Sequence, residues 1–139
     1  MRVTPPDLEL WLTGYVRRLA AAEGSDLVVS NKEPHDLQLP VTRPVVVVRD
    51  DSGAPLDWTV FDRYVGVSVL AGTRLHDAPA KELARWLSAV LFDDGLPLVE
   101  SSPIASVEWS GCNGPYSVPE NLDVTRMYFT AQYVVSGSW

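Results

Sequence analysis

An alternating stretch at residues 124–135 constrains the fold more than any other feature of the chain. Its apolar positions are Met127, Phe129, Ala131, Tyr133 and Val135, and the positions between them include Arg126, Tyr128, Thr130 and Gln132. Successive side chains of a β-strand point to opposite faces of a sheet, so the pattern predicts a strand with one apolar and one polar face. Such strands are typical of antiparallel sheets that are covered on one side.

Two segments have the spacing of amphipathic helices that could provide this cover. The first is predicted over residues 5–22, with Thr4 as its N-cap and Asp7 at the third helical position. The second has Asp77 as its cap and Pro79 in its first turn. Apolar residues recur three and four positions apart in both segments. They are Leu8, Trp11, Leu12, Tyr15, Val16 and Leu19 in the first, and Leu83, Trp86, Leu87, Val90 and Leu91 in the second.

Several shorter segments have β-type composition. They are residues 26–30, 45–48, 58–71, 96–100 and 104–109. The sequence DDSGAP at residues 50–55 has strong turn chemistry, which predicts a hairpin between two of these strands. The glycines and prolines of GCNGPYSVPE, residues 111–120, predict a loop. The principal elements follow the order α-β-β-β-α-β-β, which predicts a single α+β domain over residues 1–139. In this domain, two amphipathic helices pack on a mostly antiparallel β-sheet.

Charge and composition narrow the possible functions. The formal net charge is −7, and the basic residues are scattered among acids, which argues against nucleic-acid binding. The single cysteine cannot form an internal disulfide. We expect neither a signal peptide nor a membrane-spanning helix, because all apolar runs are short. Synthesis in the cytoplasm is therefore the expectation.

The sequence offers little that resembles an active site. It contains no phosphate-binding or dinucleotide-binding glycine loop and no nucleophile elbow, and His35 and His76 stand apart from any metal-spaced cluster. We therefore expect no catalytic residue, no cofactor and no metal. Cys112 has the acids Glu108 and Glu120 nearby, which disfavour a thiolate. We interpret it as a small, half-buried residue in a turn.

Four segments, taken together, resemble the tail terminator proteins of long-tailed phages, also called tail-completion or minor tail proteins, particularly those of actinobacterial hosts. They are PPDLELWLTGYVRRL (5–19), PVVVVRDDSG (44–53), VGVSVLAGTR (65–74) and NGPYSVPE (113–120). None is a catalytic fingerprint, so the resemblance depends on their combination across nearly the whole chain. It implies a structural virion protein, not an enzyme, that forms a hexameric ring at the head-proximal end of the tail.

The resemblance also implies a role in tail assembly and a set of partners. The ring would form in the host cytoplasm, cap the tail tube, end tube polymerisation and take part in head–tail joining as the docking surface for the head. Its partners would be further copies of the chain, the tail tube protein and a head–tail connector or neck protein. DNA would pass through the lumen without specific binding, because a ring with net negative charge would not attract its phosphates. We expect no membrane to be involved.

We expect the assembly contacts to lie in loops, because helices and strands are committed to the core. The candidate residues are Arg49, Asp50 and Asp51 at the hairpin tip, Arg74 and His76 before the second helix, and Asn113, Tyr116 and Glu120 in the loop at 111–120. Tyr116 is the expected docking side chain, because a stiff loop loses little entropy on binding. Two alternatives remain: a head–tail joining or head-closure protein of the same virion, and a small cytosolic enzyme that uses Cys112 or a His-Asp pair.

Overall fold

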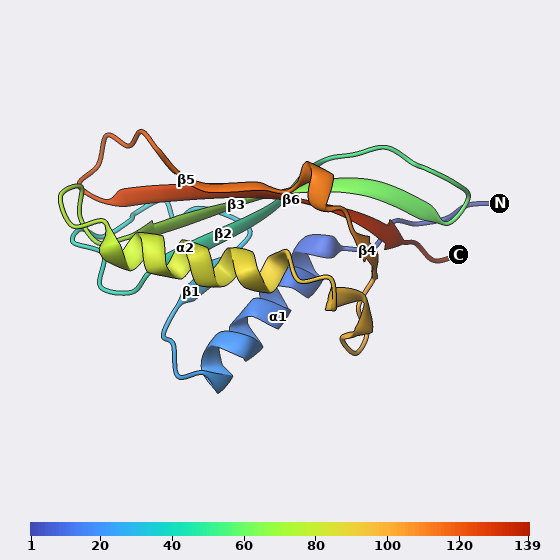
Figure 1. The fold of residues 1–139 in the computed structure, drawn as a ribbon, viewed down its shortest axis with the longest axis horizontal. Coiled ribbons are helices and arrows are strands. Elements are labelled where there is room, and N and C mark those ends of the chain that lie inside the picture. Colours follow the sequence, from blue (N-terminus) through green and yellow to red (C-terminus); the bar gives the residue numbers. More distant parts are fainter.

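The computed structural model describes residues 1–139 and contains one six-stranded sheet with two helices on the same side (Figure 1). The helices are α1 (Leu8–Ala22) and α2 (Ala78–Leu91). The strands are β1 (Val28–Ser30), β2 (Val45–Ser52), β3 (Val60–Ala71), β4 (Ile104–Val107), β5 (Asn113–Val118) and β6 (Thr125–Ser136). The predicted α+β class and order of elements are confirmed, and β5 is an additional strand in the second half.

Strand β6 is the centre of the sheet. The strand order is β1-β2-β3-β6-β4, and β5 also pairs with β6. β3 and β6 pair antiparallel along their full length, from Val60 opposite Ser136 to Ala71 opposite Thr125. On the other side of β6, β4 pairs with the C-terminal half and β5 with the N-terminal half. Only β1 and β2 are parallel.

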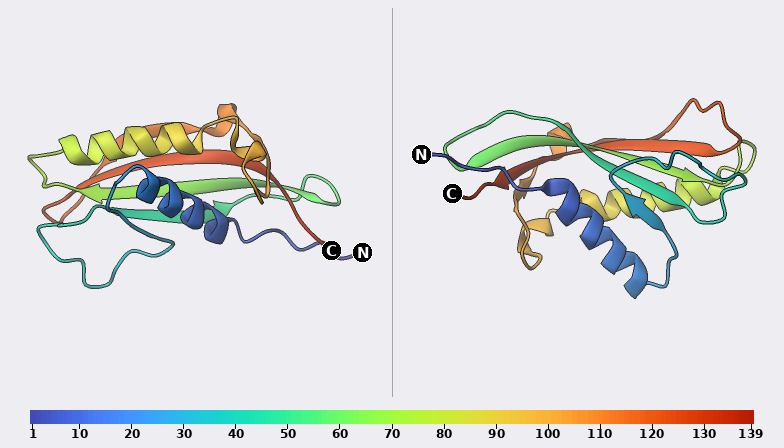
Figure 2. Two further views of the ribbon diagram at one scale, coloured as in Figure 1. Left: turned by 90° about the horizontal axis from the view of Figure 1, so that it is seen from below. Right: turned by 180° about the vertical axis from the view of Figure 1, so that it is seen from behind.

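Both helices cover one face of the sheet, as the views in Figures 1 and 2 show. The alternation predicted for the last strand is confirmed: Met127, Phe129, Ala131, Tyr133 and Val135 all point into the core beneath the helices. The main core cluster contains 21 buried residues, drawn from both helices and all strands except β5. Burial of this apolar surface is the dominant force that holds the helices on the sheet.

The opposite face is covered only at one end. There the connection at residues 31–44 places Leu37 and Val41 against a small cluster formed by Val45, Val47, Leu70 and Val124. Beyond this cluster the face is open. We call it the uncovered face; it carries Arg49 and Asp51 of β2, Tyr64, Gly66 and Ser68 of β3, Tyr116 of β5, and Arg126, Tyr128, Thr130 and Gln132 of β6.

The first helix begins later than predicted. Asp7, not Thr4, is the N-cap, and its carboxylate accepts a hydrogen bond from the Leu10 amide at 3.1 Å. Thr4 instead forms an isolated antiparallel bridge with Ser138, which holds the preceding segment in an extended form. The second helix begins at Ala78 with Asp77 at the cap position, as predicted, although the Asp77 carboxylate pairs with Lys81 at 3.1 Å and caps no amide.

Two predicted elements are wrong: the turn that begins at residue 50 and the strand at residues 96–100. Residues 50–52 are not a turn: they continue β2, where Arg49 pairs with Gly66 and Asp50 with Val65. The hairpin tip therefore lies at 53–59. Residues 96–100 are not a strand, because Leu96–Leu98 form a short 3-10 helix that contains Pro97. Proline lacks the N–H that a strand ladder needs, and the 3-10 turn does not require it.

The predicted loop at 111–120 is also wrong. After a short 3-10 turn at Trp109–Gly111, the chain enters β5, in which Tyr116 pairs with Tyr128 and Val118 with Arg126. The pairing register shifts between Asn113 and Tyr116, and this irregularity accommodates Gly114 and Pro115. Neither helix is long and apolar enough to cross a lipid bilayer.

Candidate assembly surfaces

The structure brings three of the predicted residues, Arg49, Asp51 and Tyr116, onto the uncovered face. Tyr128 links two of them: its hydroxyl lies 3.4 Å from the Asp51 carboxylate, and its ring meets the Tyr116 ring edge-to-face at a centroid distance of 6.0 Å. Burial and the neighbouring Asp51 charge raise the pKa of Tyr128, so its hydroxyl stays protonated and donates the hydrogen bond. A row of polar and aromatic side chains thus crosses the sheet from β2 to β5.

Gly66 makes this crossing possible. It lies on β3, between Asp51 and Tyr128, and a Cβ at this position would overlap both the carboxylate and the hydroxyl. The glycine therefore provides the space in which side chains from β2 and β6 meet above β3. The expectation that assembly contacts lie in loops left out Gly66 and Tyr128, because both are strand residues.

A second group of charged residues lies where β6 begins. Arg126 contacts the carboxylates of Glu120 and Glu33, each at 2.6 Å. The hydrogen bond from Arg126 lowers the pKa of Glu120, against a smaller opposing effect of burial. Arg74 donates to the carbonyl oxygens of Glu120 and Asn121 at 2.9 and 3.0 Å. The structure therefore brings Arg74 and Glu120 into contact. Their bonds are made within the chain, where they stabilise this end of the fold.

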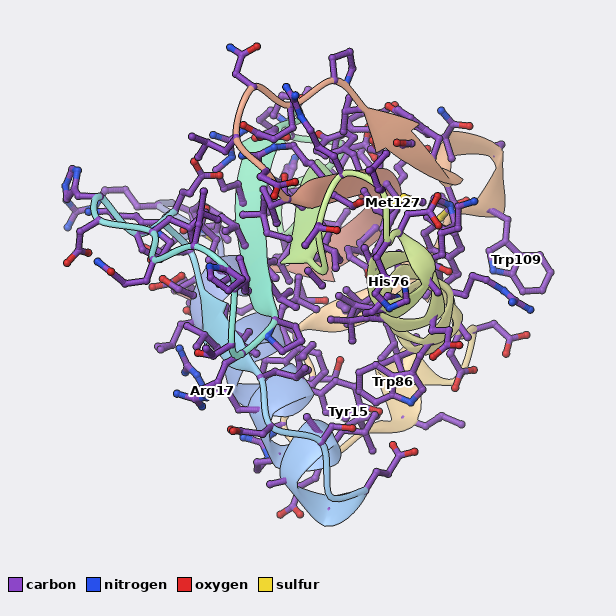
Figure 3. The ribbon with its side chains drawn as sticks, turned by 90° about the vertical axis from the view of Figure 1, so that its left-hand side faces the viewer. Tyr15, Arg17, His76, Trp86, Trp109 and Met127 are labelled. Carbon is purple, nitrogen blue, oxygen red and sulfur yellow. The ribbon has the colours of Figure 1, made fainter.

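His76 and Asn113 lie apart from these groups. His76 is exposed in the tight turn before α2, where its amide contacts Thr73 (Figure 3). Asn113 opens β5, opposite Thr130 and several residues from the Arg126 group. Neither side chain belongs to the row of polar and aromatic side chains that crosses the uncovered face.

Asp50, unlike its neighbours, points to the helix side of the sheet. Its carboxylate pairs with Arg63 at 2.8 Å, and its amide donates to the Glu9 carboxylate of α1 at 2.7 Å. Burial raises the pKa of Asp50, although the hydrogen bond from Arg63 opposes the change. The placement of Asp50 at an exposed hairpin tip is therefore wrong, and the residue instead connects α1 to β2.

Cys112 does not have the surroundings of a nucleophile. Burial raises the pKa of its thiol, and the Glu108 carboxylate raises it further. The Sγ atom contacts the Glu108 carbonyl at 3.5 Å, and the side chain packs against the main core cluster. Trp109 stands beside it, exposed at the surface, and its ring nitrogen donates to the Phe92 carbonyl at the end of α2 (Figure 3). The interpretation of Cys112 as a half-buried packing residue agrees with this geometry.

We expect Cys112 to react with a disulfide reagent such as DTNB several times more slowly than free cysteine at pH 7.5. The thiolate is the reactive species, and both burial and the raised pKa reduce its population and its access. The absorbance of the released thiolate measures the rate. The same reaction in 6 M guanidinium chloride is the control and should be fast; equal rates in folded and unfolded protein would contradict this account.

Large apolar side chains are exposed at both ends of the long β3 strand. Near its start, the hairpin at 53–59 carries Leu56 and Trp58, which are 56% and 76% exposed. Near its end, Leu75 is fully exposed and Leu122 is 44% exposed. The exposure of these side chains follows from turns that composition alone does not place.

A polar pocket of about 250 Å³ on the uncovered face was also missed. It is lined by Asn31, Lys32, Glu33, Val47, Arg49, Ser68 and Arg126. The alternation of β6 placed Arg126 on the polar face, but no local signal indicated that residues 31–33 fold back over it. No group of three or more His, Cys, Asp and Glu side chains is arranged to hold a metal ion. Comparison with known protein families finds no match for this sequence, and no curated protein is recognisably similar to it.

Proposed function

We propose that this protein is a tail terminator of a long-tailed phage, a subunit of a hexameric ring that caps the tail tube and offers the docking surface for the head. Two kinds of support bear on this. The sequence resembles that family over four segments, and the α+β architecture suits the small α/β subunit that the family implies. The surfaces described above are suited to contact with other protein chains.

The observation that carries the proposal is the pair of unlike apolar surfaces at the two ends of the sheet. Trp58 and Leu75 lie in the turns at the two ends of a strand of 12 residues, which is about 40 Å long at roughly 3.3 Å per residue. Exposed large apolar side chains mark interaction sites when they gather in patches. A ring of identical subunits uses two different surfaces on each copy, one for each neighbour.

The proposed mechanism is physical, not chemical. One face of the ring binds the last ring of the tail tube and occludes the surface that the next tube subunit needs. Ring closure follows when the rotation between neighbouring copies returns to its start after a fixed number of subunits. The net charge of −7 suits a lumen through which DNA slides, because like charges do not hold the phosphate backbone.

Phage particles assembled without this protein test the proposal. We expect tails that grow far beyond the normal length, because nothing stops addition of tube subunits, and electron microscopy of the lysate measures the length distribution. Restoring the gene in trans should restore normal length. Tails of normal length that fail to join heads would contradict a terminator and indicate a head–tail joining protein of the neck.

The mass of the purified protein provides a second test. Mass photometry or light scattering, with and without purified tail tubes, should detect a multimer that is either formed in solution or assembled on tube ends. Cryo-electron microscopy of the capped tubes then shows the number of copies and the wall of the lumen. A protein that remains monomeric and does not bind tubes contradicts the proposal.

A further inference from the structure

We propose that the polar pocket on the uncovered face binds the carboxylates of an acidic turn, residues 93–100, from a second copy of the chain. The second copy is the one that the proposed ring would supply, so this inference rests on that function. The pocket combines Lys32, Arg49 and Arg126 with a single carboxylate, that of Glu33. We call it the basic pocket.

The basic pocket is built from both the sheet and the connection that follows β1. Val47 and Ser68 are opposite each other on β2 and β3 and lie next to Arg49, while residues 31–33 form the remaining wall. Three cationic side chains and one carboxylate, that of Glu33, line this recess, so its lining is basic in a chain whose net charge is −7.

The three cations differ in how far they are already paired. Arg126 is held by two carboxylates at 2.6 Å and gives the pocket a fixed side. Arg49 is 60% exposed, and its Nε lies 3.7 Å from the Asp51 carboxylate, beyond hydrogen-bond distance. Lys32 is exposed and takes part in none of the chain's ion pairs. Lys32 and Arg49 are therefore the charges available to an incoming carboxylate.

The acidic turn is the chain's own matching surface. The sequence DDGLPLVE at residues 93–100 contains three acids and no basic residue, and Asp93, Asp94 and Glu100 are all exposed. Leu98, at 90% exposure, adds an apolar contact in the same turn. The short 3-10 helix at Leu96–Leu98 and the hydrogen bond from the Gly95 amide to Asp93 hold the turn in shape. A preorganised turn loses little entropy when it binds.

The acidic turn and the basic pocket lie on opposite sides of the molecule. The turn follows α2 on the helix side, below the sheet in Figure 1, whereas the pocket opens on the uncovered face. One copy therefore cannot fill its own pocket. Contact between the uncovered face of one copy and the helix side of the next is heterologous, which is the kind of interface that closes into a ring. Opposite charges on the two surfaces also steer the copies into register.

A peptide titration tests the pocket without any ring. We expect a synthetic peptide of sequence DDGLPLVE to bind the protein in a buffer of low ionic strength and to be released as salt rises, because salt screens exposed charges. Chemical-shift changes at residues 31–33, 47–49 and 68 would report the site. The same peptide with its acids replaced by amides, and the Arg49→Glu protein, are the controls that should not bind. Absence of binding by the acidic peptide, or equal binding by the amide peptide, overturns the inference.

A charge exchange tests the same contact in the assembly. Arg49→Glu and Asp94→Arg should each weaken assembly roughly tenfold or more, since each places like charges opposite one another. The double variant should recover, because the two exchanged side chains again meet with opposite charges across the contact between copies. Arg85→Glu, an exposed charge change on α2 that belongs to neither the acidic turn nor the basic pocket, is the matched control and should assemble as the natural chain does. Assembly on tail tubes is followed by mass.

The outcomes separate this inference from the proposed function. If the natural chain caps tubes and both single variants do so equally well, the acidic-turn contact is wrong and the terminator role stands. If the natural chain caps no tubes, the terminator role fails, and the peptide titration still decides whether the basic pocket accepts carboxylates. A double variant that assembles no better than the two single variants also contradicts the contact.

Discussion

Replacing Phe129 with alanine is expected to lower the free energy of unfolding by about 3–5 kcal/mol, the range for deletion of a large buried aromatic side chain. Phe129 is completely buried at the centre of β6 and meets the Phe92 ring edge-to-face at 5.4 Å. Its removal leaves a cavity between the sheet and the end of α2, where close packing prevents full collapse. Urea denaturation followed by circular dichroism measures the loss.

Tyr128→Ala is the matched control for this change. Tyr128 is the preceding residue on the same strand, but its side chain lies on the uncovered face, where it contacts the Tyr116 ring and the Asp51 carboxylate. We expect a cost of about 1 kcal/mol. Equal losses for the two variants would mean that the uncovered face is packed as tightly as the helix side.

Replacing Arg126 with methionine is expected to cost about 1–2 kcal/mol at pH 7, after allowance for the solvent screening of a partly exposed group. Arg126 connects Glu33 and Glu120 at 2.6 Å, and methionine leaves both carboxylates without their partner. The Glu120 side chain is only 14% exposed, so water replaces the lost hydrogen bond incompletely. Chemical denaturation at a series of pH values measures the difference from the natural protein.

The effect of Arg126 should depend on pH in a definite direction. Its hydrogen bond lowers the folded-state pKa of Glu120 below the ordinary value of 4.5. The stabilisation is therefore fully present above pH 4.5 and is lost as the pH falls through the folded-state pKa, so the two proteins should converge in acid. Arg43→Met, which removes an ion pair with Asp26 whose partners are 52% and 75% exposed, should cost little at any pH. If the difference in unfolding free energy between Arg126→Met and the natural protein stays constant as the pH falls, this assignment is contradicted.

The sequence predicts those parts of the fold in which local pattern and tertiary environment agree. Both helices were found because their apolar residues recur with the helical period and each buries one side on the sheet. The alternation along β6 was correct for the same reason: one face lies under the helices and the other lies on the uncovered face. Periodicity reports the environment of a side chain, so it predicts both the element and its orientation.

Errors occurred where tertiary pairing outweighs local preference. Asp50 and Asp51 favour turns in isolation, yet β3 provides hydrogen-bond partners for this stretch, and Arg63 balances the charge of Asp50. Gly114 and Pro115 likewise suggest a loop, but β6 pairs with the residues on either side of them. Strand propensity depends strongly on the neighbouring strand, and that neighbour is distant in sequence.

The candidate surface was predicted in part. Arg49, Asp51 and Tyr116 were named as loop residues, and they are near one another because their strands are connected through β3 and β6. The alternation along β6 placed Arg126 and Tyr128 on the polar face, but neither was among the candidate residues, because assembly contacts were expected in loops. A basic pocket assembled from residues 31–33, β2, β3 and β6 requires contacts between distant segments, and these cannot be found without the sheet topology.

The central position of β6 has a consequence for how the protein folds during synthesis. Strands β3, β4 and β5 all use β6 as a neighbour, and β6 comes after each of them along the chain. Until residues 125–136 have left the ribosome, β4 and β5 have no pairing partner and β3 is unpaired on one edge. Contacts between distant segments form slowly, because their loop entropy must be overcome first. A nascent chain thus has no complete sheet, and the uncovered face is complete only after translation has passed β6.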